Sequence, residues 1–227
     1  TGLNKDIAAG VSPNDLILSV RAKTERIAND ALDAMEKMVS STLNKEAEEG
    51  IRPHTLQSAL RVQPEANFAL ISVPGPFARR EAESALNAGL HCMVFSDNVS
   101  VEDEVFLKTL AGNKDLLFMG PDCGTAIIGN RALAFANVVS RGGVGIVGAS
   151  GTGIQAISVL VDRLGDGISH AIGTGGRDLS KEVEGRSMLQ GIRMLGGDKS
   201  TKVLRLVSNP SDPGVMKRVL EAAVETG

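Results

Sequence analysis

Short apolar runs alternate along the chain with amphipathic stretches of helical spacing. Most of these runs are continuous, which is typical of strands that are covered on both faces of a parallel sheet. The expected strands are residues 16–20, 68–73, 91–95, 116–119, 133–138, 144–148, 168–173 and 203–207. Strands that alternate with helices indicate βαβ crossovers, so we predict an α/β fold of parallel sheets.

A polar segment at residues 140–142 separates two series of strand–helix units. We therefore predict two Rossmann- or flavodoxin-like domains, over residues 1–140 and 141–227. The second series has only three units and stops just after a helix, and the chain does not begin with Met. We expect the natural protein to be longer and the second domain to be truncated here.

The composition of the chain excludes several classes of binding partner. The 227 residues are 42% hydrophobic and 22% charged, as in ordinary globular proteins. A net charge of −3 gives no basic field for nucleic acid or an anionic membrane, and six Phe with no Trp or Tyr offer little stacking surface. Two cysteines without metal spacing fit a reducing compartment. We predict a cytoplasmic protein with no metal, membrane or nucleic-acid partner.

Glycine is abundant, with 26 residues, and one cluster lies between an expected strand and helix. In this cluster Gly151 and Gly153 free the backbone, while Ser150 and Thr152 add hydroxyl donors. The unpaired N–H groups of a helix start attract anions, so these four residues are candidates for binding a phosphate or carboxylate. The alternative is a helix cap whose glycines allow close strand–helix packing.

Two further loops follow expected strands at the same sheet edge. The loop after residues 168–173 contains Gly175, Gly176 and Arg177, and Arg177 is a candidate clamp for an anion. Alternatively, Arg177 and Asp178 pair with each other or cap the next helix. Cys123, after residues 116–119, is interpreted as a packing or contact residue, with covalent catalysis as the alternative.

Taken in order, these loops resemble the α subunit of succinyl-CoA synthetases over about residues 66–227. The matching strings are ISVPGPFARREAESALNAG, FSDNVSVEDE, MGPDCGTA, GIVGASGTG and AIGTGGRD. The series GPDCGTAI, LAFANV, GASGTGIQ and HAIGTGGRDLS is similar to the FdrA family, whose synthetase-like members are found with purine and allantoin breakdown systems.

The resemblance implies a CoA-binding-type first domain and a ligase-type, flavodoxin-like second domain, with CoA as candidate cofactor and a second subunit or domain as partner. It implies CoA contacts at Val73, Pro74, Phe77, Ser96, Asp97, Asn98, Pro121 and Cys123. It also implies that the helix start at residues 150–153 corresponds to the helix that faces a phosphohistidine in true synthetases.

Three departures from the synthetase pattern keep other functions open. The run at residues 16–20 continues into Arg21–Lys23, where synthetases carry a glycine-rich CoA loop. Ser208–Pro210 stand where synthetases carry a Glu, and there is no GHAGA-like phosphohistidine segment, since His170 lies elsewhere in the pattern. The hypotheses are an acyl-CoA-synthetase-like ligase component, a carbamoyltransferase component acting on carbamoyl phosphate and oxamate, and a non-catalytic metabolite-binding module.

Overall fold

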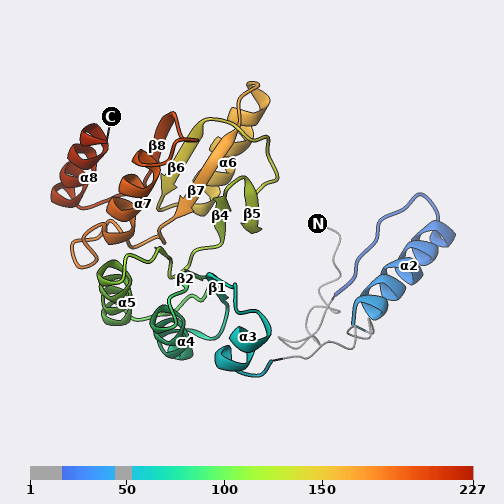
Figure 1. The fold of residues 1–227 in the computed structure, drawn as a ribbon. Coiled ribbons are helices and arrows are strands. Elements are labelled where there is room, and N and C mark those ends of the chain that lie inside the picture. The colour runs from blue at the N-terminus through green and yellow to red at the C-terminus, as the bar shows by residue number, and fades with distance from the viewer. Residues whose placement is uncertain (1–16, 44–52, 227) are drawn as a thin grey trace. The chain divides into compact units, whose positions relative to one another are not determined.

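The computed structural model describes residues 17–43 and 53–226, and the chain divides into two units, Thr1–Arg52 and Pro53–Gly227. The described part of the first unit contains helix α2 (Glu25–Leu43), whose apolar positions follow the expected helical spacing (Figure 1). The strand predicted at 16–20 is wrong over residues 17–20, which form no strand, and Leu16 lies outside the described residues. Strands need a neighbour to satisfy their backbone groups, and no described strand pairs with this run.

The second unit begins with a Rossmann-like parallel sheet in the order β1-β2-β3, with helices between the strands (Figure 1). Ser100 caps α5 by accepting the Asp103 amide at 3.1 Å, and a proline lies in the first turn of α4. The elements are α3 (Leu56–Val62), β1 (Phe68–Ile71), α4 (Gly75–Asn87), β2 (His91–Val94), α5 (Val101–Asn113) and β3 (Phe118–Met119). The three predicted strands of this part and the two helices between them are confirmed.

A second, mixed sheet has the strand order β5-β4-β7-β6-β8. Strands β6, β7 and β8 are parallel and each is followed by a helix, which confirms the three predicted units. The antiparallel hairpin β4–β5 joins this sheet beside β7. Its elements are β4 (Thr125–Ile128), β5 (Arg131–Ala134), β6 (Val144–Gly148), α6 (Gly151–Arg163), β7 (Ile168–Gly173), α7 (Arg186–Gly196), β8 (Val203–Val207) and α8 (Pro213–Glu225).

We predicted parallel sheets, but the second sheet is mixed, because β4 pairs antiparallel with β5 and with β7. Strand β4 was missed because a four-residue run after a glycine turn carries no periodicity that separates strand from loop. The strands therefore change sheet between β3 and β4, ahead of residues 140–142. The division into folding domains 1–140 and 141–227 stays a prediction.

The two sheets share a hydrophobic core. Met93 and Met119 from the first sheet belong to the same buried cluster as Val147, Ile172 and Met188 from the second sheet and α7. Each fully buried side chain of this size contributes roughly 1.5–3 kcal/mol of transfer free energy. This shared core fixes the loops of one sheet against the loops of the other.

A row of loops at the carboxyl ends of the strands

The loops that follow β1, β2 and β3 are bound directly to one another. The Val73 amide donates to Ser96 Oγ at 3.1 Å, and the Asp122 amide donates to the Ser96 carbonyl at 3.0 Å. Gly75 lies so close to the next loop that a Cβ there would be 2.3 Å from the Asp97 carbonyl oxygen. Ligands of parallel sheets bind beyond the carboxyl ends of strands, which is where this loop group lies.

The loops after β6 and β7 pack beside the loop after β3. We call the loops that follow β1, β2, β3, β6 and β7 the row of loops. Gly175 has φ +86°, and a Cβ there would lie 2.3 Å from the Pro121 carbonyl oxygen. A Cβ on Gly173 would lie 2.5 Å from Cys123 Sγ. The space between these loops is only about 10 Å³, which is room for one water at most. The glycines here serve close backbone packing, and a ligand would have to lie on the outer side of the row.

The start of α6 is capped by its own serine. Ser150 Oγ accepts the Gly153 amide at 3.2 Å and lies 3.4 Å from Thr152 Oγ1. The alternative of a helix cap is therefore present in the structure. Within the described chain the amides of Gly151 and Thr152 have no protein acceptor, and Thr152 is exposed. Two N–H groups thus remain available to an anion at this helix start.

The side chains expected to contact CoA differ in their accessibility. Phe77 is 61% exposed at the first turn of α4, and Pro74, Asp97 and Asn98 are also exposed. Pro121 and Cys123 are buried, as is Ser96, whose oxygens hold the neighbouring loops. The residues able to touch a ligand directly are therefore the exposed ones, while the buried ones support them.

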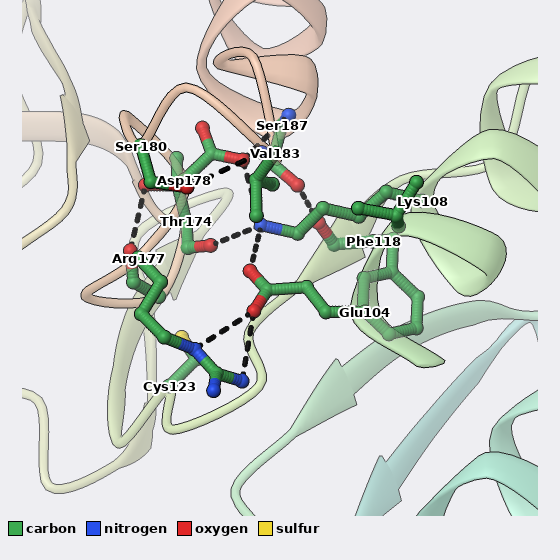
Figure 2. A network of polar contacts seen from close by, with 12 residues as sticks. Glu104, Lys108, Phe118, Cys123, Thr174, Arg177, Asp178, Ser180, Val183 and Ser187 are labelled. Carbon is green, nitrogen blue, oxygen red and sulfur yellow. Dashed lines mark hydrogen bonds and ion pairs between the residues drawn. The ribbon is translucent and has the colours of Figure 1, made fainter. Parts of the chain in front are cut away.

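A network of four charged side chains, three of them buried, joins α5 to the loop after β7 (Figure 2). Lys108 Nζ donates to Asp178 Oδ1 at 2.6 Å and to the Thr174 carbonyl at 2.9 Å, and forms an ion pair with Glu104 Oε1 at 2.8 Å. The side chains of Lys108, Glu104 and Asp178 are at most 1% exposed. The buried ammonium group thus has two hydrogen bonds and two carboxylate partners, as a buried charge requires.

Asp178 also fixes the start of α7. Its Oδ1 accepts the Ser187 amide at 3.1 Å and its Oδ2 accepts the Met188 amide at 2.8 Å. The carboxylate thereby satisfies two unpaired N–H groups of the first helical turn and faces the positive end of the helix dipole. Helix capping was one of the alternatives for this loop. Asp178, which precedes α7 in the chain, caps the helix through these two hydrogen bonds.

Arg177 is held by residues of the first sheet. Its Nη2 lies 2.9 Å from Glu104 Oε2, and its Nε donates to Glu104 Oε2 at 3.1 Å (Figure 2). The Nη2 also donates to the Val99 carbonyl at 2.8 Å. A bidentate clamp on a ligand would need this pair to open, so the role of Arg177 in binding stays a prediction. Arg177 and Asp178 make no ion pair with each other in the described chain.

Glu104 and Lys108 were not singled out by sequence reasoning. Their i, i+4 spacing on a helix does signal an ion pair, but such pairs are usually exposed on the helix surface. What buries them is the loop after β7, which is far away in the sequence. Only the tertiary structure reveals that this pair belongs to the row of loops.

Cys123 has the properties of a packing residue. Its Sγ donates to the Gly173 carbonyl at 3.4 Å, and the side chain is 3% exposed. Burial raises the pKa of the Cys123 thiol to about 11, so the reactive thiolate is rare at neutral pH. This supports the packing interpretation over covalent catalysis.

His170 lies away from the row, within β7. Its Nδ1 accepts the Gly129 amide at 3.2 Å, and its Nε2 lies 3.6 Å from Asp198 Oδ2. It therefore does not stand in for a phosphohistidine beside the glycine loops. Among residues 17–43 and 53–226 no three His, Cys, Asp or Glu side chains are grouped to hold a metal, and no helix in those ranges is long and apolar enough to cross a membrane.

Comparison with known proteins agrees with the fold and the motifs. Residues 139–226 match the CoA binding domain family. The match covers the second sheet's parallel strands, the part that we expected to be ligase-type. It does not decide which of the two predicted domains contacts CoA.

The curated relatives are longer than this chain. Uncharacterized protein YahF of Escherichia coli is 49% identical over 209 residues, which are 92% of this chain and 40% of YahF. Subunit alpha 2 of the ADP-forming succinate–CoA ligase of Archaeoglobus fulgidus is 30% identical over 67% of this chain and 53% of the subunit. The chain thus spans about half the length of the curated relatives that it matches, or less.

Solved structures show the same fold at low sequence identity. A protein of Pyrococcus horikoshii, PH0766, superposes with a TM-score of 0.59 over 81% of this chain and 42% of its own, at 18% identity. The dinucleotide-forming acetyl-coenzyme A synthetase 1 of Ca. Korarchaeum cryptofilum gives 0.55 over 70% of this chain and 35% of its own, at 20% identity. The chain is therefore an α/β protein similar to the α subunit of succinyl-CoA synthetases, with a CoA-binding-domain match over residues 139–226.

Proposed function

We propose that this chain is a component of an acyl-CoA-synthetase-like ligase that binds CoA, or a phosphate- or carboxylate-bearing ligand, at the row of loops. The observation that supports this is the packing of loops from five strands into one row, with Ser96 bound to both Val73 and Asp122. The motifs that carry the resemblance to synthetases are these same loops. The similarity to a subunit named for succinate–CoA ligation supports the same activity class.

Different parts of the row would contact different parts of CoA. Exposed Phe77 offers an apolar surface, and exposed Asp97 and Asn98 offer polar groups beside it. The free amides of Gly151 and Thr152 would stabilise a phosphate through hydrogen bonds and the helix dipole. When bound, CoA would supply the thiol that accepts an acyl group.

A ligase of this kind would work with a second subunit or domain. The relatives named succinate–CoA ligase are α subunits, and this chain spans about half of their length. Among the described residues near the row, Cys123 is buried, and Glu104, Lys108, Arg177 and Asp178 are paired within the charged network. We infer that the transferring residue is provided outside residues 17–43 and 53–226.

A carbamoyltransferase component of purine or allantoin breakdown is the second candidate. The segment that carries a Glu in synthetases here contains Asn209, whose Nδ2 donates to the Ala149 carbonyl at 3.2 Å. A neutral amide in this position cannot stabilise the positive charge of a phosphohistidine as a carboxylate does. This favours an FdrA-type protein that acts on carbamoyl phosphate and oxamate. The third candidate is a non-catalytic metabolite-binding module.

Ligand-induced stabilisation separates these functions. We would measure the melting temperature with CoA, ATP, succinate, carbamoyl phosphate and oxamate in turn. A ligand at 100 times its Kd stabilises by about 2.7 kcal/mol, which is an easily measured shift. A shift with CoA supports ligation and a shift with carbamoyl phosphate supports transfer. No shift with any of the five would contradict both enzymatic proposals.

A pair of matched variants tests the location of the CoA site. Phe77→Ala should weaken CoA binding about tenfold, because the variant loses the aromatic ring that bound CoA would cover. Leu164→Ala removes another exposed apolar side chain, 77% exposed at the end of α6, and should leave the affinity unchanged. Equal affinity of Phe77→Ala and the unaltered chain in titration calorimetry would remove Phe77 from the site.

A further inference from the structure

A second cavity lies at the opposite ends of β1, β2 and β3 from the row of loops. Its volume is about 500 Å³, which is within the range of small-molecule sites. The lining residues are Asn67, Phe68, His91, Leu117, Ile128, Arg131, Leu133, His170, Ile172, Met194, Leu195 and Asp198. Seven of these twelve side chains are aliphatic, aromatic or thioether groups, so most of the wall is apolar. The residues named above for CoA do not line this cavity.

Both histidines of this cavity have the same tautomer. His91 Nδ1 accepts the Leu117 amide at 2.9 Å, and His170 Nδ1 accepts the Gly129 amide at 3.2 Å. A neutral imidazole whose Nδ1 accepts a hydrogen bond carries its proton on Nε2. The Nε2–H of His170 is directed to Asp198, whereas the Nε2–H of His91 has no partner among the described residues. His91 therefore presents an unused donor.

The two charged residues of this cavity are not equivalent. Asp198 Oδ2 accepts Ser200 Oγ at 2.5 Å and Thr201 Oγ1 at 2.7 Å, so the carboxylate is already satisfied. Arg131, exposed on edge strand β5, has no ion-pair or hydrogen-bond partner in the described chain. Among the titratable side chains of the cavity, the unused groups are therefore donors, His91 Nε2–H and the Arg131 guanidinium, and the Asn67 amide can also donate.

We propose that this cavity binds a small amphipathic carboxylate. Its apolar tail would lie against Leu117, Leu133 and Ile172, and its carboxylate would accept hydrogen bonds from Arg131 and His91 Nε2–H. An arginine fork matches a carboxylate, and apolar walls exclude the water that would weaken the pair. This site is separate from the row of loops and does not depend on the proposed ligase activity.

Titration calorimetry with octanoate, octanol and octylamine tests the proposal. Octanoate should bind with the highest affinity, octanol at least fivefold more weakly, and octylamine should not bind. The three probes share a tail and differ only in the head group. Affinity of octylamine or octanol equal to that of octanoate would overturn the assigned head-group contacts, and no binding of octanoate at millimolar concentration would overturn the site.

Two arginines on the opposite edge strands of one sheet provide a matched pair. Arg131→Gln should weaken octanoate binding about tenfold, the loss of one charge-assisted hydrogen bond. Arg205→Gln, on edge strand β8, also removes an exposed arginine without a partner in the described chain and should leave the affinity unchanged. Both side chains are exposed, so neither variant is expected to unfold. Equal octanoate affinity in the two variants would contradict the proposal.

Discussion

The two ends of the first sheet offer ligands different chemistry. At the carboxyl ends, the buried charged side chains are already used, because Lys108 binds both Glu104 and Asp178. What remains there is backbone N–H, exposed Phe77 and the exposed polar side chains of Asp97 and Asn98. At the amino ends, an apolar cavity retains unpaired donors in His91 and Arg131. The comparison teaches that charge near a loop does not by itself indicate a ligand, because what matters is whether the charge is still unpaired.

We expect the largest effect from removing Lys108, which lies at the centre of the charged network. Lys108→Met leaves buried Asp178 without a cationic partner and buried Glu104 with Arg177 alone, and should lower the free energy of unfolding by about 3–5 kcal/mol. Urea denaturation measures this loss. Lys114→Met, at an exposed position after α5, is the control. A loss below about 1 kcal/mol, as for exposed pairs, would mean that the network is not a structural clamp.

Two adjacent glycines test the close packing of the row. Gly175→Ala places a Cβ 2.3 Å from the Pro121 carbonyl oxygen at φ +86°, and should cost about 2 kcal/mol or more in unfolding free energy. In Gly176→Ala the new Cβ would lie 4.0 Å from its nearest neighbour, Asn209 Nδ2, and stability should change by less than about 0.5 kcal/mol. Similar values for the two variants in urea denaturation would show that the loop is not fixed by this approach.

The smallest effect concerns the carboxylate beside the cavity. Hydrogen bonds from Ser200 and Thr201 lower the pKa of Asp198 to about 2, with a smaller contribution from His170. A depressed pKa stabilises the fold above the unfolded value of about 3.9, and this stability is lost as the pH falls toward 2. Because Asp198 is partly exposed, we expect less than about 1 kcal/mol.

The measurement for Asp198 is the urea midpoint from pH 5 to pH 2. The unaltered chain should lose more stability over this interval than Asp198→Asn, which has no carboxyl proton to bind at this position. Asp115→Asn removes an exposed carboxylate with no side-chain partner in the described chain and should behave like the unaltered chain. Parallel pH profiles of Asp198→Asn and the unaltered chain would contradict the hydrogen-bonded state of Asp198.

Much of the fold could be predicted because strands such as Ile168–Gly173 are apolar runs bounded by glycine. The failures have physical reasons. Residues 17–20 are as apolar as a strand, but a strand needs a partner that sequence cannot show. Because they form no strand, Arg21–Lys23 do not follow a strand either, and these residues hold no counterpart of the glycine-rich CoA loop of synthetases. Strand β4 was missed because it is defined by pairing rather than by periodicity.

The candidate site was less predictable than the fold. The loops could be found because glycines and polar residues follow each strand, and the parallel topology places them at one edge. The pairing of Arg177 with Glu104 could not, because these residues are 73 positions apart in the chain. Sequence reasoning identifies which groups are present, and only the structure shows which of them remain unpaired.

Hydrogen–deuterium exchange with saturating CoA reports which end of the sheet the ligand protects. We predict slower exchange in peptides covering residues 73–77, 96–98 and 150–153, and unchanged exchange in residues 128–133 beside the cavity. Protection confined to residues 128–133, or no protection anywhere while CoA is bound, would contradict the assignment of the row of loops as the CoA site.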